Sequence, residues 1–86
     1  MPGILKPLLK AAMENEAKAL SHGIRRTRER LSAFEKEFGI TSDEFERRFG
    51  AAEIVETLEF IDWLGEIRML RLLNEQKLAL DGANLK

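Results

Sequence analysis

The sequence contains no cysteine, no tyrosine, two prolines, one histidine and one tryptophan among 86 residues. The absence of cysteine excludes disulfides, thiolate zinc sites and cysteine nucleophiles, and it agrees with a cytoplasmic location. Lys6 and Lys10 interrupt the first apolar stretch, and no run approaches the roughly 18 apolar residues that a membrane-spanning helix needs. We therefore expect neither a membrane segment nor a signal peptide.

What is present is typical of one small helical domain. Hydrophobic residues make up 44% of the chain and charged residues 34%, a mixture that fits a folded protein rather than a disordered one. The formal net charge of −1 predicts no general attraction to nucleic acid. Residues 1–40 carry a charge of +3 and residues 41–86 a charge of −4, which favours an antiparallel hairpin of the two halves.

Residues 4–38 have the pattern of one long helix. Apolar positions alternate in steps of four and three residues, which predicts a heptad seam along one face. The members of this seam are Met13, Ala17, Leu20, Ile24, Thr27, Leu31, Phe34 and Phe38. Gly23 weakens the helix by about 1 kcal/mol relative to alanine, but we expect the helix to continue through it.

A stop signal and a start signal follow each other directly after Phe38. Gly39 is a candidate left-handed cap of the first helix. Thr41 and Glu44 have the spacing of a capping box, which predicts a short helix over residues 42–49. Two phenylalanine pairs flank this elbow, each spaced four residues apart on one helix face, and we expect them to fix the angle of the hairpin: Phe34 with Phe38, and Phe45 with Phe49.

Residues 52–78 predict a second long helix, followed by a mobile tail over residues 80–86. A helical wheel of this segment shows two apolar faces with an acidic strip beside them. One face holds Ile54, Leu58, Ile61 and Leu72, the other holds Phe60, Trp63, Ile67 and Leu70, and the strip holds Glu59, Asp62 and Glu66. Because so small a chain can hardly cover both faces, we expect a protein partner or a homodimer.

The face of Phe60, Trp63, Ile67 and Leu70 is our candidate partner interface. Tryptophan is enriched among the residues that dominate binding energy. A core position is the ordinary alternative for Trp63, since a large apolar side chain most often packs inside its own domain.

The sequence offers little support for catalysis. His22 is the only histidine, and no acid or hydroxyl surrounds it in a known arrangement. The paired carboxylates fit a solvated helix face, and no Glu-x-x-His pair, phosphate-binding glycine loop or G-x-S-x-G motif is present. We expect no enzyme activity, no catalytic or metal-binding residues, and no cofactor.

The segment RRTRER presents four arginines on two helix faces, Arg25 with Arg28 and Arg26 with Arg30. A solvated or ion-paired face, a docking patch for an acidic partner, and a contact with nucleic acid all fit this pattern. The Gly39-Ile40-Thr41 turn also resembles that of a DNA-binding helix-turn-helix. Three acids at the start of the next helix, Asp43, Glu44 and Glu46, argue against that reading.

The elbow carries a family resemblance. The pattern comprises Phe34, Glu35, Glu37, Phe38, Gly39, Ile40, Ser42, Glu44, Phe45, Arg48 and Phe49. It resembles the F-E-x-K-Y-G-M-S-S-E-E-F-x-x-K-F signature of small archaeal and cyanobacterial helical proteins, some of which are similar to antitoxins encoded beside small toxins. Asp62-Trp63 stands near the Glu-Trp pair of that family, whereas residues 47–52 depart from its loop.

These observations predict an all-α hairpin of two long antiparallel helices with a short elbow helix between them, completed by self-association or a partner. The resemblance implies a non-catalytic, antitoxin-like module that binds and masks a small basic protein, such as a co-encoded toxin, through an apolar helix face. A homodimeric helical protein and a helix-turn-helix DNA-binding regulator are the alternative hypotheses.

Overall fold

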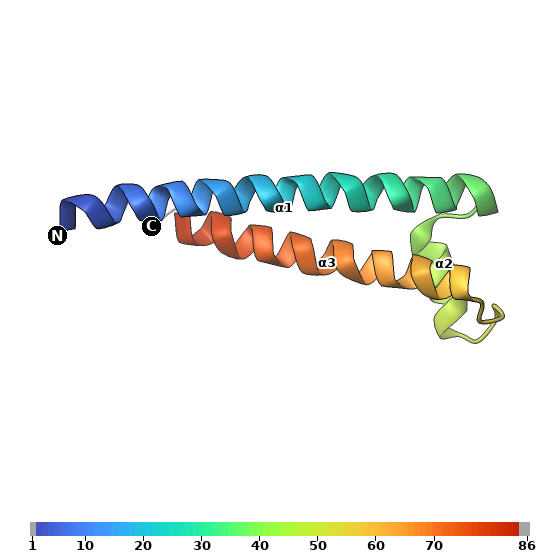
Figure 1. Cartoon of the computed structure of the whole chain (residues 1–86). Helices are drawn as coiled ribbons and strands as arrows, with labels where there is room; N and C mark the ends of the chain where they lie inside the picture. Colours follow the sequence, from blue (N-terminus) through green and yellow to red (C-terminus); the bar gives the residue numbers. More distant parts are fainter. Residues whose placement is uncertain (1, 85–86) are drawn as a thin grey trace.

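The computed structural model describes residues 2–84 of the chain, and the side chains of residues 5–82. It contains three helices, α1 (Pro2–Phe38), α2 (Ser42–Gly50) and α3 (Leu58–Asn84), and residues 2–84 include no strand. α1 and α3 run antiparallel along each other, and α2 lies between them at one end (Figure 1). The predicted all-α hairpin with a short elbow helix is confirmed.

α1 is continuous through Gly23, as the sequence predicts. A Cβ atom at Gly23 would lie 3.2 Å from Leu73 Cδ1, so this glycine lets α3 approach α1 closely. One turn further, the hydroxyl of buried Thr27 donates to the carbonyl oxygen of Gly23 at 2.8 Å. The only polar member of the seam is therefore hydrogen-bonded within its own helix.

The elbow forms as its residues predict. Gly39 adopts a φ of 71°, a conformation open to glycine, and its N–H donates to the Glu35 carbonyl oxygen at 2.8 Å. Thr41 caps α2 by accepting from the Glu44 N–H at 3.1 Å. The carboxylate of Glu35 accepts from the Ser42 N–H at 2.6 Å, so a side chain of α1 satisfies a second free amide of α2.

α3 begins six residues later than predicted and ends later as well. Ala52 has a φ of 58°, and the N–H groups of Ala51 and Glu53 bond back to α2, so residues 51–57 form a loop instead of a first helical turn. Thr57 then starts α3 by accepting from the Phe60 N–H at 3.1 Å. Residues 80–84 of the predicted tail belong to α3 and are helical, and residues 85–86 lie outside the described residues.

The core has two connected parts. Along the hairpin, α1 buries Leu20, Ile24, Thr27 and Leu31. At the elbow, Trp63 and Phe45 are both 0% exposed. The rings of Phe34 and Phe38 from α1, and of Phe45 from α2, all pack on Trp63. Three of the four rings in the predicted phenylalanine pairs thus meet on Trp63, and the fourth, Phe49, packs on Phe45.

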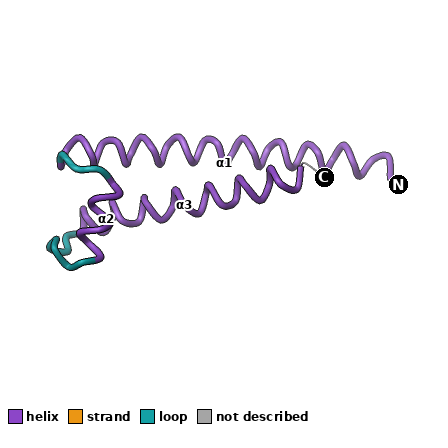
Figure 2. The backbone as a smooth tube through the Cα atoms, turned by 180° about the vertical axis from the view of Figure 1, so that it is seen from behind, coloured by secondary structure: helices purple, strands orange, loops and turns teal. Residues whose placement is uncertain are grey.

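α1 extends past the end of α3 (Figure 2). Arg30 pairs with Glu66 and Gly23 contacts Leu73, so the register brings Asn84 level with about residue 12 of α1 at equal rise on both helices. The molecule measures 59 × 21 × 19 Å and has a radius of gyration of 17.6 Å. It is a rod rather than a globule.

Candidate protein-interaction surface

The apolar face that the sequence assigns to a partner lies inside the hairpin. Trp63 is fully buried, Ile67 is 6% exposed, and Phe60 and Leu70 are partly buried against the same core. The assignment of this face as an exposed anchor is therefore corrected: its residues hold the three helices of one chain together.

The burial of Trp63 follows from the rings that the elbow supplies. Its indole stacks on Phe45 with centroids 3.9 Å apart and planes 5° apart, and on Phe34 at 5.3 Å. The indole Nε1 donates to Ser42 Oγ at 3.0 Å, which satisfies the one polar group of the side chain. All three helices thus contribute to a single closed site for this residue.

The opposite face of α3 is exposed and apolar. Leu58 is 83% exposed, and Ile61, Met69 and Leu72 are 46–48% exposed. We call these four residues, with Gly65 between them, the outer stripe. Apart from Gly65, its two chain neighbours and the adjacent backbone of α3, nothing in the described part of the chain lies within 4 Å of the position of a Cβ on Gly65, so a second helix can approach there. The wheel identified three stripe members as one face, but periodicity could not tell which of the two faces the hairpin covers.

A second exposed apolar surface lies at the start of α1. Leu5, Leu8 and Leu9 are 67%, 63% and 58% exposed, because this part of the helix, which we call the free arm, projects beyond α3. Lys6 and Lys10 lie on the same arm. The sequence did not predict this surface, because it could not show that α1 extends beyond the end of α3.

The four arginines of residues 25–30 differ in their contacts: some pair with side chains of the same chain, and others face solvent. Arg30 Nε lies 3.2 Å from Glu66 Oε1, so this arginine ties α1 to α3. Arg25 Nη2 donates to His22 Nδ1 at 3.0 Å on the surface of α1. Arg26 and Arg28 are exposed. Of the alternatives left open by the sequence, ion pairing accounts for Arg30.

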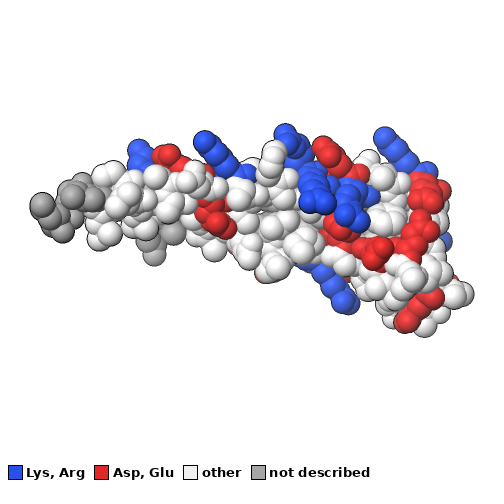
Figure 3. Space-filling view, viewed as in Figure 1, with Lys and Arg blue, Asp and Glu red and all other residues white. Residues whose placement is uncertain are grey.

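Acidic side chains gather at the elbow end, and lysine and arginine side chains lie over the middle of α1 (Figure 3). Residues 35–66 contain ten Asp/Glu and three Lys/Arg, a formal charge of −7, whereas the other 54 residues sum to +6. Partial desolvation, with added repulsion from Glu37 and Asp62, raises the pKa of Glu59. The elbow end is therefore net acidic, whereas the rest of the chain is net basic.

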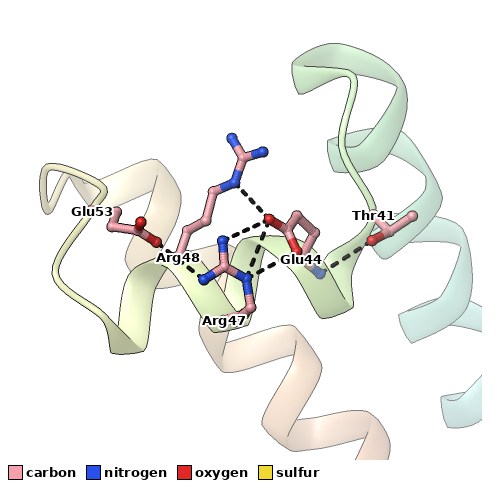
Figure 4. A network of polar contacts seen from close by, with 5 residues as sticks. All are labelled: Thr41, Glu44, Arg47, Arg48 and Glu53. Carbon is pink, nitrogen blue, oxygen red and sulfur yellow. Dashed lines mark hydrogen bonds and ion pairs between the residues drawn. The ribbon is translucent and has the colours of Figure 1, made fainter.

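Exposed ion pairs link the arginines of α2 to carboxylates on and beside the helix. Glu44 accepts from Arg47 Nη2 at 2.9 Å and from Arg48 Nε at 2.9 Å, and Arg47 also pairs with Glu53 at 3.3 Å (Figure 4). These hydrogen bonds from two arginines lower the pKa of Glu44 to about 2. Both arginines of α2 thus face a carboxylate of their own chain rather than standing alone as phosphate contacts.

The lowered pKa of Glu44 makes a prediction for acid stability. Because its pKa falls from 4.5 to about 2 on folding, Glu44 stabilises the folded state above about pH 4.5, and that contribution disappears as the pH falls toward 2. We expect Glu44→Gln to lose less stability than the wild type between these pH values, in thermal unfolding at low salt. Glu56→Gln, at an exposed loop position, serves as the control. Parallel losses in the wild type and Glu44→Gln would contradict the assignment.

The described residues show no grouping of three or more His, Asp or Glu side chains that could hold a metal ion. Within the same residues, no helix is long and apolar enough to cross a membrane. Comparisons with protein-family models, with curated proteins and with solved structures found no match to this chain. The surfaces described above are therefore the basis for a functional proposal.

Proposed function

We propose that this chain is a non-catalytic protein-binding module of the cytoplasm, antitoxin-like, which binds and masks a small basic partner protein. The outer stripe of α3 would contact the partner through apolar side chains, and the acidic elbow end would attract it. The observation that carries this proposal is the exposure of Leu58, Ile61, Met69 and Leu72 along one face of α3. The opposite face of α3 packs against α1 and α2 inside the hairpin.

Position and charge support the pairing of these two surfaces. The first half of the outer stripe, Leu58 and Ile61, lies on the same helical turns as Glu59 and Asp62. An apolar contact beside carboxylates suits a partner whose own apolar patch is bordered by lysine or arginine. The elbow resemblance to antitoxin-like proteins agrees with such a partner, and a co-encoded toxin is the proposed example.

The test is co-expression with a small basic protein encoded in a neighbouring reading frame. We expect the two proteins to purify together, with a mass by light scattering that matches a complex, and the chain to restore growth if the partner is toxic. The double substitution Met69→Lys with Leu72→Lys should abolish both effects, because it places charge in the apolar contact. Leu8→Lys, on the free arm, is the matched control and should leave both unchanged. Full binding by the stripe variant would refute the use of this face.

A further inference from the structure

We propose that a second copy of this chain occupies the outer stripe, with the two α3 helices packed antiparallel. The inference rests on the proposed function, since it concerns the same exposed face and states what covers it when no other partner is bound. It also implies that a heterologous partner must displace the second copy before it binds there.

The first argument is the area that one chain leaves exposed. Its accessible surface is 6701 Å², whereas folded monomers of 9.8 kDa expose about 5200 Å². Its radius of gyration of 17.6 Å compares with about 12 Å for a compact domain of 86 residues. Two chains together thus expose about 3000 Å² beyond the globular value, which falls within the range buried by obligate homodimers.

The second argument is the sequence periodicity of the outer stripe. Leu58, Gly65, Leu72 and Ala79 recur at intervals of seven residues on the side of α3 away from Trp63 and Ile67. Ile61 and Met69 flank this repeat, so the exposed apolar residues form one continuous stripe along α3, the kind of face that a helix buries against another helix. α3 therefore carries two seams, of which α1 and α2 cover one. The uncovered seam fits a partner helix that has a similar length and the same repeat. The α3 helix of a second copy has both properties.

The third argument is charge, and it sets the orientation. On α3 the first nine residues hold Glu59, Asp62 and Glu66 without a cation, whereas residues 67–84 hold three cations and two acids. Glu66 and Arg71 pair within the chain, with Arg30 and Glu46 respectively, so Glu59, Asp62, Arg68 and Lys77 are the groups left to face a second copy. Antiparallel packing keeps the acidic starts of the two α3 helices apart and brings each toward Arg68 and Lys77 of the other copy, and it also opposes the two helix dipoles. Parallel packing would bring the two elbow ends together, each with a formal charge of −7.

The experiment is mass by light scattering and sedimentation of the chain alone over a range of concentrations. We expect a wild-type mass of about twice 9.8 kDa. Met69→Lys with Leu72→Lys should remain helical by circular dichroism and raise the dissociation constant by about 100-fold or more. Leu8→Lys replaces a leucine that is 63% exposed on the free arm and should remain a dimer.

Orientation is measured separately with spin labels, which is direct because the chain has no cysteine. Val55→Cys labels an exposed loop position at the elbow end. Antiparallel copies should place the two labels about 40 Å apart or more, given 1.5 Å of rise per residue, and parallel copies should place them within about 20 Å. The short distance would overturn the proposed packing.

The remaining outcomes separate this inference from the proposed function. A wild-type monomer at high concentration, or a dimer broken by Leu8→Lys and not by the stripe variant, refutes the second copy at the stripe. If such a chain still binds the co-encoded protein through Met69 and Leu72, the proposed function survives alone. If the chain is a dimer through the stripe but never binds that protein, the inference stands and the antitoxin-like role fails.

Discussion

Replacing Trp63 with alanine is expected to lower the free energy of unfolding by about 3–5 kcal/mol. The side chain is 0% exposed, stacks on Phe34 and Phe45, and donates to Ser42 Oγ. A domain of this length has a total stability of roughly 4–13 kcal/mol at the usual value per residue. The loss is therefore a large share of the total, and urea unfolding followed by circular dichroism at 222 nm should show a much lower midpoint.

Two milder substitutions test the cause of that loss. Trp63→Phe keeps a ring among the phenylalanines but removes the hydrogen bond to Ser42, and Ser42→Ala removes the same bond from the other side. A double-mutant cycle should give a coupling of about 0.5–1.5 kcal/mol for the bond, leaving most of the alanine effect to packing. An alanine variant with an unchanged unfolding midpoint would contradict the buried position of Trp63.

Because Trp63 is buried, a charged substitution there tests the stability of the fold rather than self-association. Trp63→Glu places a carboxylate among four aromatic rings, where desolvation opposes the charge. We expect it to unfold the chain, so it cannot serve as a probe of self-association. Substitutions on the outer stripe can do so, because their side chains are already in contact with solvent.

Local signals allowed the sequence to predict the elbow well. Gly39 and Thr41 act within a few residues of themselves, the first through its left-handed conformation and the second through its hydroxyl. The heptad seam of α1 also predicted the buried residues Leu20, Ile24 and Leu31. Cap residues act on their near neighbours, and the seam is one periodic pattern, so both can be recognised in the sequence alone.

The sequence could not decide which side of α3 is covered. Periodicity defines two apolar faces, but their coverage depends on where the phenylalanines of the elbow come to lie. Trp63 is buried because Phe45 on α2 reaches it, a contact between residues that are 18 positions apart. The start of α3 also differs from the prediction. The pair Ala51-Ala52 favours a helix by composition, but it forms a turn in which Ala52 has positive φ.

Phe45→Ala is expected to have the second large effect, a loss of about 3–5 kcal/mol. α2 has nine residues, too few to be stable alone in water, and its one fully buried side chain is Phe45, which also packs near Phe60. Losing this ring removes both the anchor of α2 and the partner that stacks on Trp63.

The matched control for Phe45 is Phe49→Ala, which deletes the same ring one turn later at a half-buried position of the same helix. We expect it to cost less, about 1–3 kcal/mol, because less of that ring is removed from water on folding. Amide hydrogen exchange should show that Phe45→Ala lowers protection in α2 and at the Trp63 end of α3, whereas Phe49→Ala mainly affects the end of α2. An equal or larger loss for Phe49→Ala would mean that α2 is anchored by its last turn, and the stack of Phe45 on Trp63 would no longer explain how the elbow holds the hairpin.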